Sequence, residues 1–247
     1  MKTLTIHFEA EEVLRLPLSK FDLLQGVFYQ LLRSGNSELA SALHDAAGGR
    51  QFKRFCFTDL HGRGSIREKI VSFSGPLSWE IRSMDDTIID AIYEALCKNG
   101  RFEIHKTPCR VIFLREQSSR ALFGAGIMLV SMDTPITVYE TAKDGRRTFL
   151  APTDEGFYTA VENNLRRKYQ AIYGREPDSG IEFRRKPAAD FRKCVTFYSG
   201  APVTAYYGSF LLTAPGDVCD IAYYCGIGAK NSQGFGTIRF LKRQIER

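Results

Sequence analysis

The sequence has no long hydrophobic run. No stretch approaches the ~18 consecutive apolar residues that a membrane-spanning helix requires, and residues 1–10 lack the apolar core of a secretory signal peptide. Hydrophobic residues make up 44% of the 247 residues and charged residues 25%, so the composition also excludes a disordered or collagen-like chain. These absences predict a globular protein with a sizeable buried core and no membrane association.

The sequence also lacks cysteine motifs. It contains six cysteines but no Cys-x-x-Cys pair, and the nearest two, Cys219 and Cys225, do not have the usual spacing of zinc ligands. No cluster of histidine and acidic residues has metal-ligand spacing either. We therefore expect no metal and no cofactor, and we interpret the cysteines as reduced, mostly buried thiols of a cytoplasmic protein.

The excess of basic over acidic residues is mild. The chain has 34 lysines and arginines against 28 aspartates and glutamates, a formal net charge of +6. This balance permits an anionic partner but does not demand one. Basic pairs and triplets gather in the second half, where each is either a solvated face or a phosphate contact. They are Arg146–Arg147, Arg166–Lys168, Arg184–Lys186, Arg192–Lys193 and Lys242–Arg243.

The first half of the chain alternates strand and helix patterns. Period-two alternation marks strands, and apolar residues three and four apart mark helices. The expected elements are a strand at Leu4–Phe8, a helix at Phe21–Leu32, strands beginning at Phe55 and Ile70, a helix over about Asp85–Lys98 and a strand at Val111–Leu114. A further helix-forming segment from Glu38 to Asp45 is expected to end at Gly48–Gly49.

The second half repeats this order approximately. Thr153–Glu155 has the character of a helix N-terminus, and the helix behind it is expected to end at Gly174. The expected strands and helices are a strand at Ile127–Val130, the helix with apolar residues from Tyr158 to Ile172, strands at Val195–Phe197, Val203–Tyr207 and Phe210–Leu212, a short helix at Val218–Tyr224 and a strand at Thr237–Leu241. The sequence thus predicts an α+β fold of two tandem ferredoxin-like (RRM-like) βαββαβ domains, residues 1–123 and 124–247.

The most distinctive motif is glycine-rich and lies between Gly226 and Gly236. It reads Gly–apolar–Gly, five residues, Gly–apolar–Gly. Glycine lets backbone N–H groups approach a ligand closely, so such a loop can cradle phosphates, and Lys230 would add charge. The motif fits neither the P-loop nor the dinucleotide fingerprint, whose third glycine position is occupied by Asn231. The alternative is a glycine-rich hairpin that serves only the fold.

This motif resembles the glycine signature of the RAMP superfamily of CRISPR-associated proteins. Within it, the chain is similar to the CRISPR-associated endoribonuclease family six, which processes CRISPR precursor RNA. The segment Ala42–Asp45 followed by Lys53–Thr58 resembles the histidine helix and Lys-x-Phe-x-Phe-Ser strand of that family, with Thr58 in place of serine. The spacing of Tyr29 and His44 also suits the tyrosine and histidine that several members use.

The resemblance implies a metal-independent ribonuclease. The 2′-hydroxyl of the RNA would attack the adjacent phosphate and leave a 2′,3′-cyclic phosphate and a 5′-hydroxyl. His44 is the first choice for general base or acid, because histidine titrates near neutral pH; its place near a helix C-terminus favours the acid. Tyr29 would orient or protonate the leaving oxygen and Lys53 would hold the phosphate. His61, in a polar loop, is the runner-up.

The resemblance also implies contacts to CRISPR repeat RNA. The basic run before Pro187, where we expect an irregular segment to begin, is preferred for backbone contacts. The implied RNA-binding residues are Gly226, Gly228, Lys230, Asn231, Ser232, Gln233, Gly234, Gly236, Arg184, Arg185 and Lys186. Subunits of a CRISPR effector complex are a second class of partner, and a monomer and a homodimer are both compatible with the sequence.

Two other functions remain open from the sequence. One is a non-catalytic RAMP-type RNA-binding subunit of a CRISPR effector complex. The other is an unrelated RRM-like RNA-binding protein, which should carry aromatic RNP motifs on its central strands. We find no such motif, since Gly234-Phe235-Gly236 lies in a different context.

Overall fold

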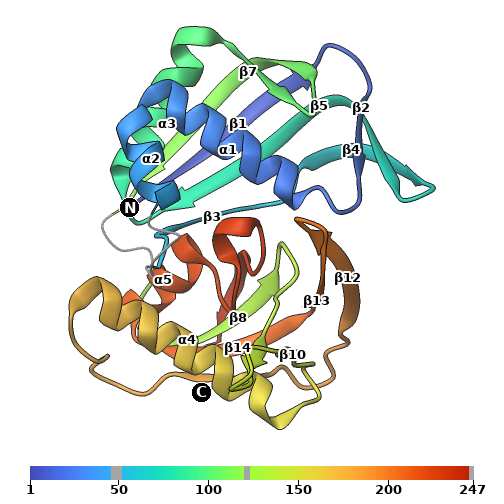
Figure 1. The fold of residues 1–247 in the computed structure, drawn as a ribbon. Helices are drawn as coiled ribbons and strands as arrows, with labels where there is room; N and C mark the ends of the chain where they lie inside the picture. The colour runs from blue at the N-terminus through green and yellow to red at the C-terminus, as the bar shows by residue number, and fades with distance from the viewer. Residues whose placement is uncertain (46–51, 120–122, 245–247) are drawn as a thin grey trace. The chain divides into compact units, whose positions relative to one another are not determined.

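The computed structural model describes residues 1–45, 52–119 and 123–244 (Figure 1). Its contacts divide the chain into two compact units. The first unit is Met1–Ser118 together with Ser232–Gly234, and the second unit is the remainder. The domain boundary expected at residues 123/124 stays a prediction. Both units combine helices with antiparallel sheets, as the sequence predicts.

The first unit is built on one antiparallel sheet. Its strands follow the order β2-β5-β1-β7-β6, and β3 and β4 also pair with β5, which makes seven strands among the described residues. The strands are β1 (Lys2–Ala10), β2 (Leu14–Pro17), β3 (Phe55–Phe57), β4 (His61–Arg67), β5 (Ile70–Ser83), β6 (Arg101–Ile104) and β7 (Thr107–Ser118). Taken in order, β1, α1, β3 with β4, β5, α3 and β7 form the expected βαββαβ arrangement.

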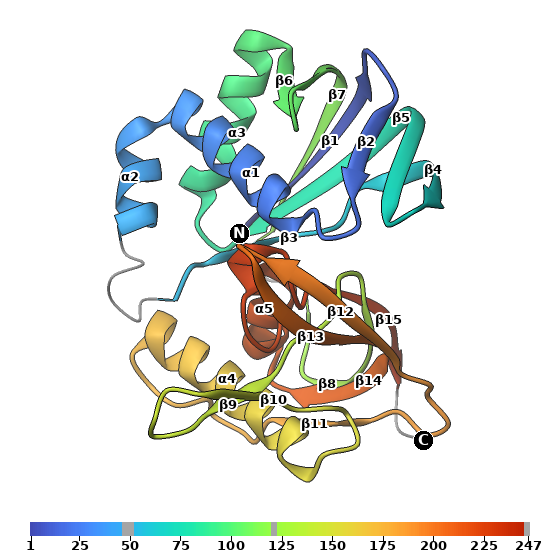
Figure 2. The same ribbon diagram turned by 45° about the vertical axis from the view of Figure 1, so that its right-hand side comes forward.

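Helices α1 (Phe21–Gly35) and α3 (Asp86–Asn99) lie on the same face of this sheet (Figures 1 and 2). The sequence explains the packing, because alternate residues of β1 point to this face and are fully buried. These residues are Leu4, Ile6 and Phe8. The short helix α2 (Ser37–Asp45) follows α1 directly. Its predicted end at Gly48–Gly49 lies outside the described residues.

The second unit contains a four-stranded antiparallel sheet in the order β11-β14-β8-β15. With its helices it forms the second βαββαβ arrangement, which the sequence also predicts. The elements are β8 (Gly126–Met132), α4 (Glu155–Tyr173), β11 (Glu182–Arg185), β14 (Ser209–Ala214), α5 (Gly216–Cys225) and β15 (Ile238–Gln244). Helices α4 and α5 pack on each other and on strands of this sheet.

Two hairpins interrupt this arrangement. One joins β9 (Tyr139–Thr141) to β10 (Arg147–Phe149), and the other joins β12 (Arg192–Tyr198) to β13 (Ala201–Tyr207). The strands expected at 195–197 and 203–207 therefore exist, but they pair with each other and not with the central sheet. The sheet strand is β11 instead, which aligns Arg184 with Leu211 of β14.

The irregular segment expected at Arg184–Lys186 therefore begins later than predicted, at Lys186. Arg184 and Arg185 end strand β11, and only Lys186 lies beyond it. The reason is the buried side chain of Phe183, which anchors β11 beside β14 and extends the pairing through two polar neighbours.

The long helices are amphipathic. Each buries one stripe of residues, for example Leu24, Phe28 and Leu31 in α1, and leaves the other side polar. None of the helices in the described part of the chain has the length and the apolar character needed to cross a membrane.

The start of α3 provides a test of local stability. The Asp85 carboxylate caps this helix by accepting a hydrogen bond from the backbone N–H of Thr87 at 3.1 Å. Asp85→Ala should lower the free energy of unfolding by about 1 kcal/mol, whereas Asp85→Asn should change it little, because asparagine caps equally well. Urea denaturation followed by circular dichroism measures both. An equal loss in the two variants would contradict the capping role.

Candidate active site

The structure brings together the three residues proposed for catalysis, Tyr29, His44 and Lys53, within the first unit. Lys53 Nζ donates a hydrogen bond to Tyr29 Oη at 2.6 Å. The rings of Tyr29 and His44 meet edge to face, with centroids 6.0 Å apart and an interplanar angle of 81°. We refer to these residues as the Tyr29–His44–Lys53 cluster.

Packing of α1 on β3 explains why Tyr29 meets Lys53. Phe28, the neighbour of Tyr29 on α1, stacks on Phe55 of β3 with ring centroids 4.1 Å apart. Both phenylalanines are fully buried. Because Lys53 lies two residues before Phe55, this stacking places Lys53 beside α1, close to Tyr29. Tyr29 is half-buried there.

Helix α2 supplies His44 from its last turn. The side chain of Asn36 fixes the start of this helix, since its Oδ1 accepts the backbone N–H of Leu39 at 2.9 Å. Ala40 is fully buried and anchors the middle of the helix. His44 itself is exposed, so its imidazole is accessible to a substrate.

The electrostatic setting of Lys53 favours an anionic ligand. Its side chain is half-buried, and this burial lowers the pKa of Lys53 below the ordinary value of a lysine. A partly desolvated ammonium interacts with an anion more strongly than one in water, because the effective dielectric is lower. The cluster therefore combines a titratable imidazole, a phenol and a cation, the groups that phosphodiester cleavage requires.

His61, the runner-up, occupies a different place. It lies at the start of β4, opposite Ser78 of β5, and is exposed. Its segment was expected to be a loop, but pairing with β5 makes it a strand. The structure thus keeps His61 outside the Tyr29–His44–Lys53 cluster, on a solvated strand.

The glycine-rich motif forms a tightly packed loop. All four of its glycines are buried, with positive φ angles. A side chain at Gly236 would collide with the carbonyl of Ile227, so only glycine fits where the two ends of the loop cross. The middle of the loop, Asn231–Gln233, is a single 3-10 turn.

A buried lysine organises this loop from inside. Lys168 of α4 donates from Nζ to Gly226 O at 2.7 Å and to Asn231 Oδ1 at 2.6 Å. The Asn231 amide nitrogen in turn donates to the carbonyls of Ile227 and Phe235, both at 2.9 Å. Lys168 and Asn231 are only 3% and 7% exposed. Their polar groups are therefore engaged in holding the loop.

Two expectations change here. Lys168 belongs neither to a solvated basic face nor to a set of phosphate contacts, because it is buried on the apolar stripe of α4 beside Leu165 and Tyr169. Helical spacing from Leu165 was the signal that could have shown this. Asn231 was expected to contact RNA, but the structure places its side chain inside the loop.

The tip of the loop packs within the first unit. Gln25 of α1 donates from Nε2 to the carbonyl of Ser232 at 2.7 Å. A Cβ at Gly234 would lie 2.8 Å from Phe21 and 2.9 Å from Phe57, too close for either ring. Gly234 is consequently required by packing, whatever it contributes to a ligand.

Lys230 gives the loop a basic group that is not fully buried. Its Nζ lies 5.5 Å from the ring centroid of Tyr198 on β12. Burial lowers the pKa of Lys230, and the charge of Arg147 lowers it further. Ser232 and Gln233 are also half-buried, so these three side chains are the part of the motif within reach of a ligand.

The proposed basic run on β11 is exposed and partly engaged within the second unit. Arg185 donates to the carbonyl of Ala189 at 2.9 Å and lies over the ring of Phe191. Arg184 Nη1 lies 3.8 Å from Glu182 Oε1. Together with exposed Lys186 they remain candidates for phosphate contacts.

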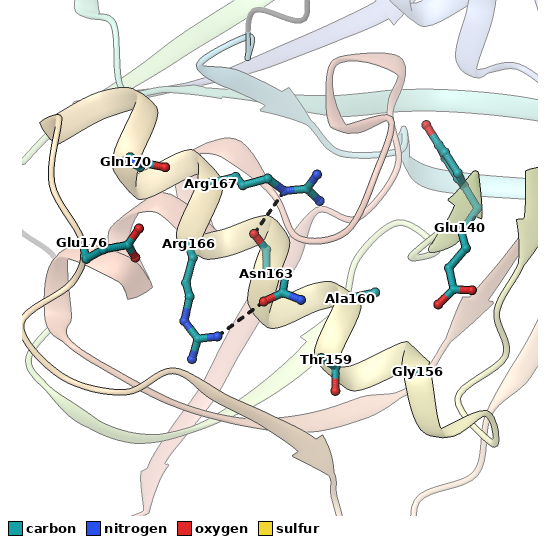
Figure 3. Close-up of a pocket in the computed structure, with 10 residues that line it drawn as sticks. Glu140, Gly156, Thr159, Ala160, Asn163, Arg166, Arg167, Gln170 and Glu176 are labelled. Atoms are coloured by element: carbon teal, nitrogen blue, oxygen red, sulfur yellow. Dashed lines mark hydrogen bonds between the residues drawn. The ribbon is translucent and has the colours of Figure 1, made fainter. Parts of the chain in front are cut away.

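A further pocket, not anticipated from the sequence, follows one face of α4 (Figure 3). Arg166 Nη1 donates to Asn163 Oδ1 at 3.4 Å, and Arg167 Nε donates to the backbone carbonyl of Asn163 at 3.2 Å. The pocket has a volume of about 550 Å³, and Glu140 and Glu176 also line it. Because charges of both signs are present, it does not by itself indicate an RNA groove.

Two of the cysteines are too deeply buried to act as nucleophiles. Cys109 and Cys219 are buried, and burial raises their pKa values to about 11 and about 12. Such thiols stay protonated and are poor nucleophiles. Within the described ranges, no three histidine, cysteine or acidic side chains are grouped to hold a metal ion.

The buried lysine leads to a prediction. Lys168→Met keeps the length of the side chain but removes the donor to Gly226 O and Asn231 Oδ1, so it should lower the free energy of unfolding by about 1–3 kcal/mol. The neighbouring Arg167→Met, at an exposed position, is the matched control and should cost little. Denaturation curves of both proteins provide the measurement. Equal stability of the two variants would show that the loop does not depend on Lys168.

Comparison with known proteins gives the family. The family described as CRISPR associated protein Cas6, C-terminal, matches residues 117–240. The curated "CRISPR-associated endoribonuclease Cas6 1" of Methanocaldococcus jannaschii is 26% identical over 225 residues, which cover 87% of this chain and 83% of the relative. The "CRISPR-associated endoribonuclease Cas6" of Pyrococcus furiosus is 24% identical over 240 residues, covering 94% and 86%.

A solved structure described as CRISPR associated protein Cas6 has the same fold. Its TM-score is 0.78 at 23% identity, and the match covers 98% of this chain and 99% of the other. The sequence match to residues 117–240 and the shared fold agree with the resemblance carried by the glycine motif and the histidine helix. The chain belongs to the CRISPR-associated Cas6 family.

Proposed function

We propose that this protein is an endoribonuclease that binds CRISPR repeat RNA and cleaves precursor CRISPR RNA. Both curated relatives are named CRISPR-associated endoribonucleases. The observation that carries the proposal for this chain is the Tyr29–His44–Lys53 cluster, in which Lys53 bonds to Tyr29 at 2.6 Å and the Tyr29 and His44 rings meet at 6.0 Å.

The proposed reaction uses the RNA, these side chains and water as a proton carrier. The 2′-hydroxyl attacks the adjacent phosphorus, the P–O5′ bond breaks, and the products are a 2′,3′-cyclic phosphate and a free 5′-hydroxyl. As a base, His44 takes the proton of the 2′-hydroxyl while Tyr29 or water protonates O5′; as an acid, His44 protonates O5′ while water takes the proton of the 2′-hydroxyl. A well-placed acid or base contributes about 10²–10⁴-fold to the rate.

Lys53 and Tyr29 act on the charge that develops at phosphorus. The Lys53 ammonium pairs with a phosphate oxygen, and its partial burial strengthens this attraction. Its hydrogen bond to Tyr29 Oη holds the phenol in a fixed orientation. Tyr29 then positions the leaving oxygen or donates a proton to it.

RNA outside the cluster is held by the glycine-rich motif and the basic run on β11. In the motif, Lys230, Ser232 and Gln233 present polar groups, while Asn231 and the four glycines shape the backbone. Arg184, Arg185 and Lys186 add phosphate contacts that carry no sequence information. Because these contacts are to phosphates, RNA binding should weaken as the salt concentration rises, and sequence specificity should come from other residues.

The decisive experiment uses labelled CRISPR repeat RNA in the presence of a chelator. The wild-type chain should cleave once per repeat and yield a cyclic phosphate, and His44→Ala should reduce the single-turnover rate by about 10²–10⁴-fold. His61→Ala, which changes the exposed histidine of β4, is the matched control and should cleave normally. Tight binding without cleavage by the wild type would favour a non-catalytic RNA-binding subunit and reject the proposal.

The lowered pKa of Lys53 predicts a specific pH dependence. A lysine with a lowered pKa loses its proton, and hence its attraction for phosphate, at a lower pH than an ordinary lysine. The single-turnover rate, corrected for uncatalysed hydrolysis, should therefore fall on the alkaline side below the usual lysine pKa of about 10.4.

Lys53→Arg should move this alkaline limb to higher pH, since arginine stays charged up to about pH 12. Lys53→Met should lose about 10²–10³-fold in rate below the alkaline limb, where the wild-type lysine is charged, and the difference should shrink above it. An alkaline limb that is the same in the wild type and in Lys53→Arg would exclude Lys53 as the titrating cation.

A further inference from the structure

A small pocket adjoins the Tyr29–His44–Lys53 cluster in the first unit and shares Lys53 with it. Its volume is about 260 Å³. Leu39 and Leu43 of α2 and Ile88 of α3 form apolar walls, and Arg54 and Asp85 line it as well. It is thus an apolar recess with a few converging polar groups, the usual composition of a ligand site.

The polar groups of the pocket are held in place by the backbone around them. The carbonyl of Arg54 accepts hydrogen bonds from Met84 N at 3.0 Å and Ser83 Oγ at 2.9 Å. The Asp85 carboxylate uses Oδ1 for both the N–H and the hydroxyl of Thr87. These bonds fix the Asp85 carboxylate and the backbone of Arg54 where both residues line the pocket, with Arg54 exposed and Asp85 half-buried.

The size and chemistry of the pocket select among RNA groups. The pocket is smaller than the roughly 300 Å³ typical of the smallest drug-sized sites, so it suits one flat ring system and not a whole nucleotide. Leu39, Leu43 and Ile88 offer contact to the faces of a ring. The carboxylate of Asp85 would repel a phosphate but accept a hydrogen bond from an amino group, and Arg54 would donate to an acceptor on the same edge.

We propose that this pocket binds the nucleobase next to the scissile phosphate and that Asp85 and Arg54 select a base whose edge pairs an amino group with an acceptor. This inference rests on the proposed function, because Lys53 holds that phosphate at the rim of the pocket. Bases that specify single-stranded RNA are commonly splayed out and read on their edges in this way. Guanine, adenine and cytosine carry the amino group, and uracil does not.

The test measures single-turnover cleavage of repeat RNAs that carry each of the four bases, or an abasic nucleotide, on either side of the scissile phosphate. At one of these two positions, uracil and the abasic nucleotide should be cut about tenfold or more slower than the best amino-bearing base, the scale of one lost base contact. Asp85→Asn should reduce the discrimination against uracil, because its amide can donate to a carbonyl. The helix cap survives in that variant.

A second experiment fills the pocket with a large side chain. Ala42 lines the pocket and is exposed on α2, so Ala42→Trp should occupy the recess without disturbing the core. This variant should cut abasic and natural RNA at equal rates. Ser41→Trp, also exposed on α2 but outside the pocket lining, is the control and should keep the base dependence.

The outcomes separate the two proposals. Wild-type cleavage at equal rates for all bases at both positions, or an unchanged base dependence in Ala42→Trp, would overturn the base pocket while leaving the endoribonuclease intact. A wild-type chain that binds the RNAs but cuts none of them would overturn the proposed function itself.

Discussion

The first unit depends on the packing of helix α1 against strand β3. Phe28 stacks on Phe55, and Phe57 lies beside the same helix residue. Burying these rings removes a large apolar area from water and fixes one element against the other. The adjacent polar residues Tyr29 and Lys53 are thereby brought within hydrogen-bond distance. The geometry of the cluster is a consequence of the core beneath it.

In the second unit, a buried polar network takes the place that stacked aromatic rings have in the first unit. There a charged residue, Lys168, is buried, and its ammonium is satisfied by Gly226 O and the side chain of Asn231. A buried charge is tolerated only when it is paired or fully hydrogen-bonded. The four glycines let the backbone approach closely enough to supply those partners. These bonds hold the base of the loop from within, whereas Ser232 and Gln233 at its tip belong to the first unit. Lys230, Ser232 and Gln233 are half-buried.

The sequence predicted the elements that carry their own signal. Helices α1, α3 and α4 lie where apolar periodicity placed them, and α3 and α4 end at Gly100 and Gly174 in the left-handed conformation. Strand β4 was missed because all of its residues are exposed and two are glycines, so it carries no alternation. It exists because β5 is long enough to pair with it. The sequence showed β12 and β13 as strands but not that they pair with each other, because strand pairing depends on two segments and not on the pattern of either one.

The sequence by itself determined the fold class and the family resemblance, and it identified His44, Tyr29 and Lys53 as candidate catalytic residues. Motifs and hydrophobic periodicity are local properties of the sequence, so no tertiary structure was needed to find them. Tertiary structure decided which of the candidate residues meet. It joined Lys53 to Tyr29, buried Lys168 and Asn231, put His61 on a solvated strand and opened a pocket between α2 and α3. These outcomes depend on contacts between residues far apart in the sequence, and only the packed core fixes such contacts.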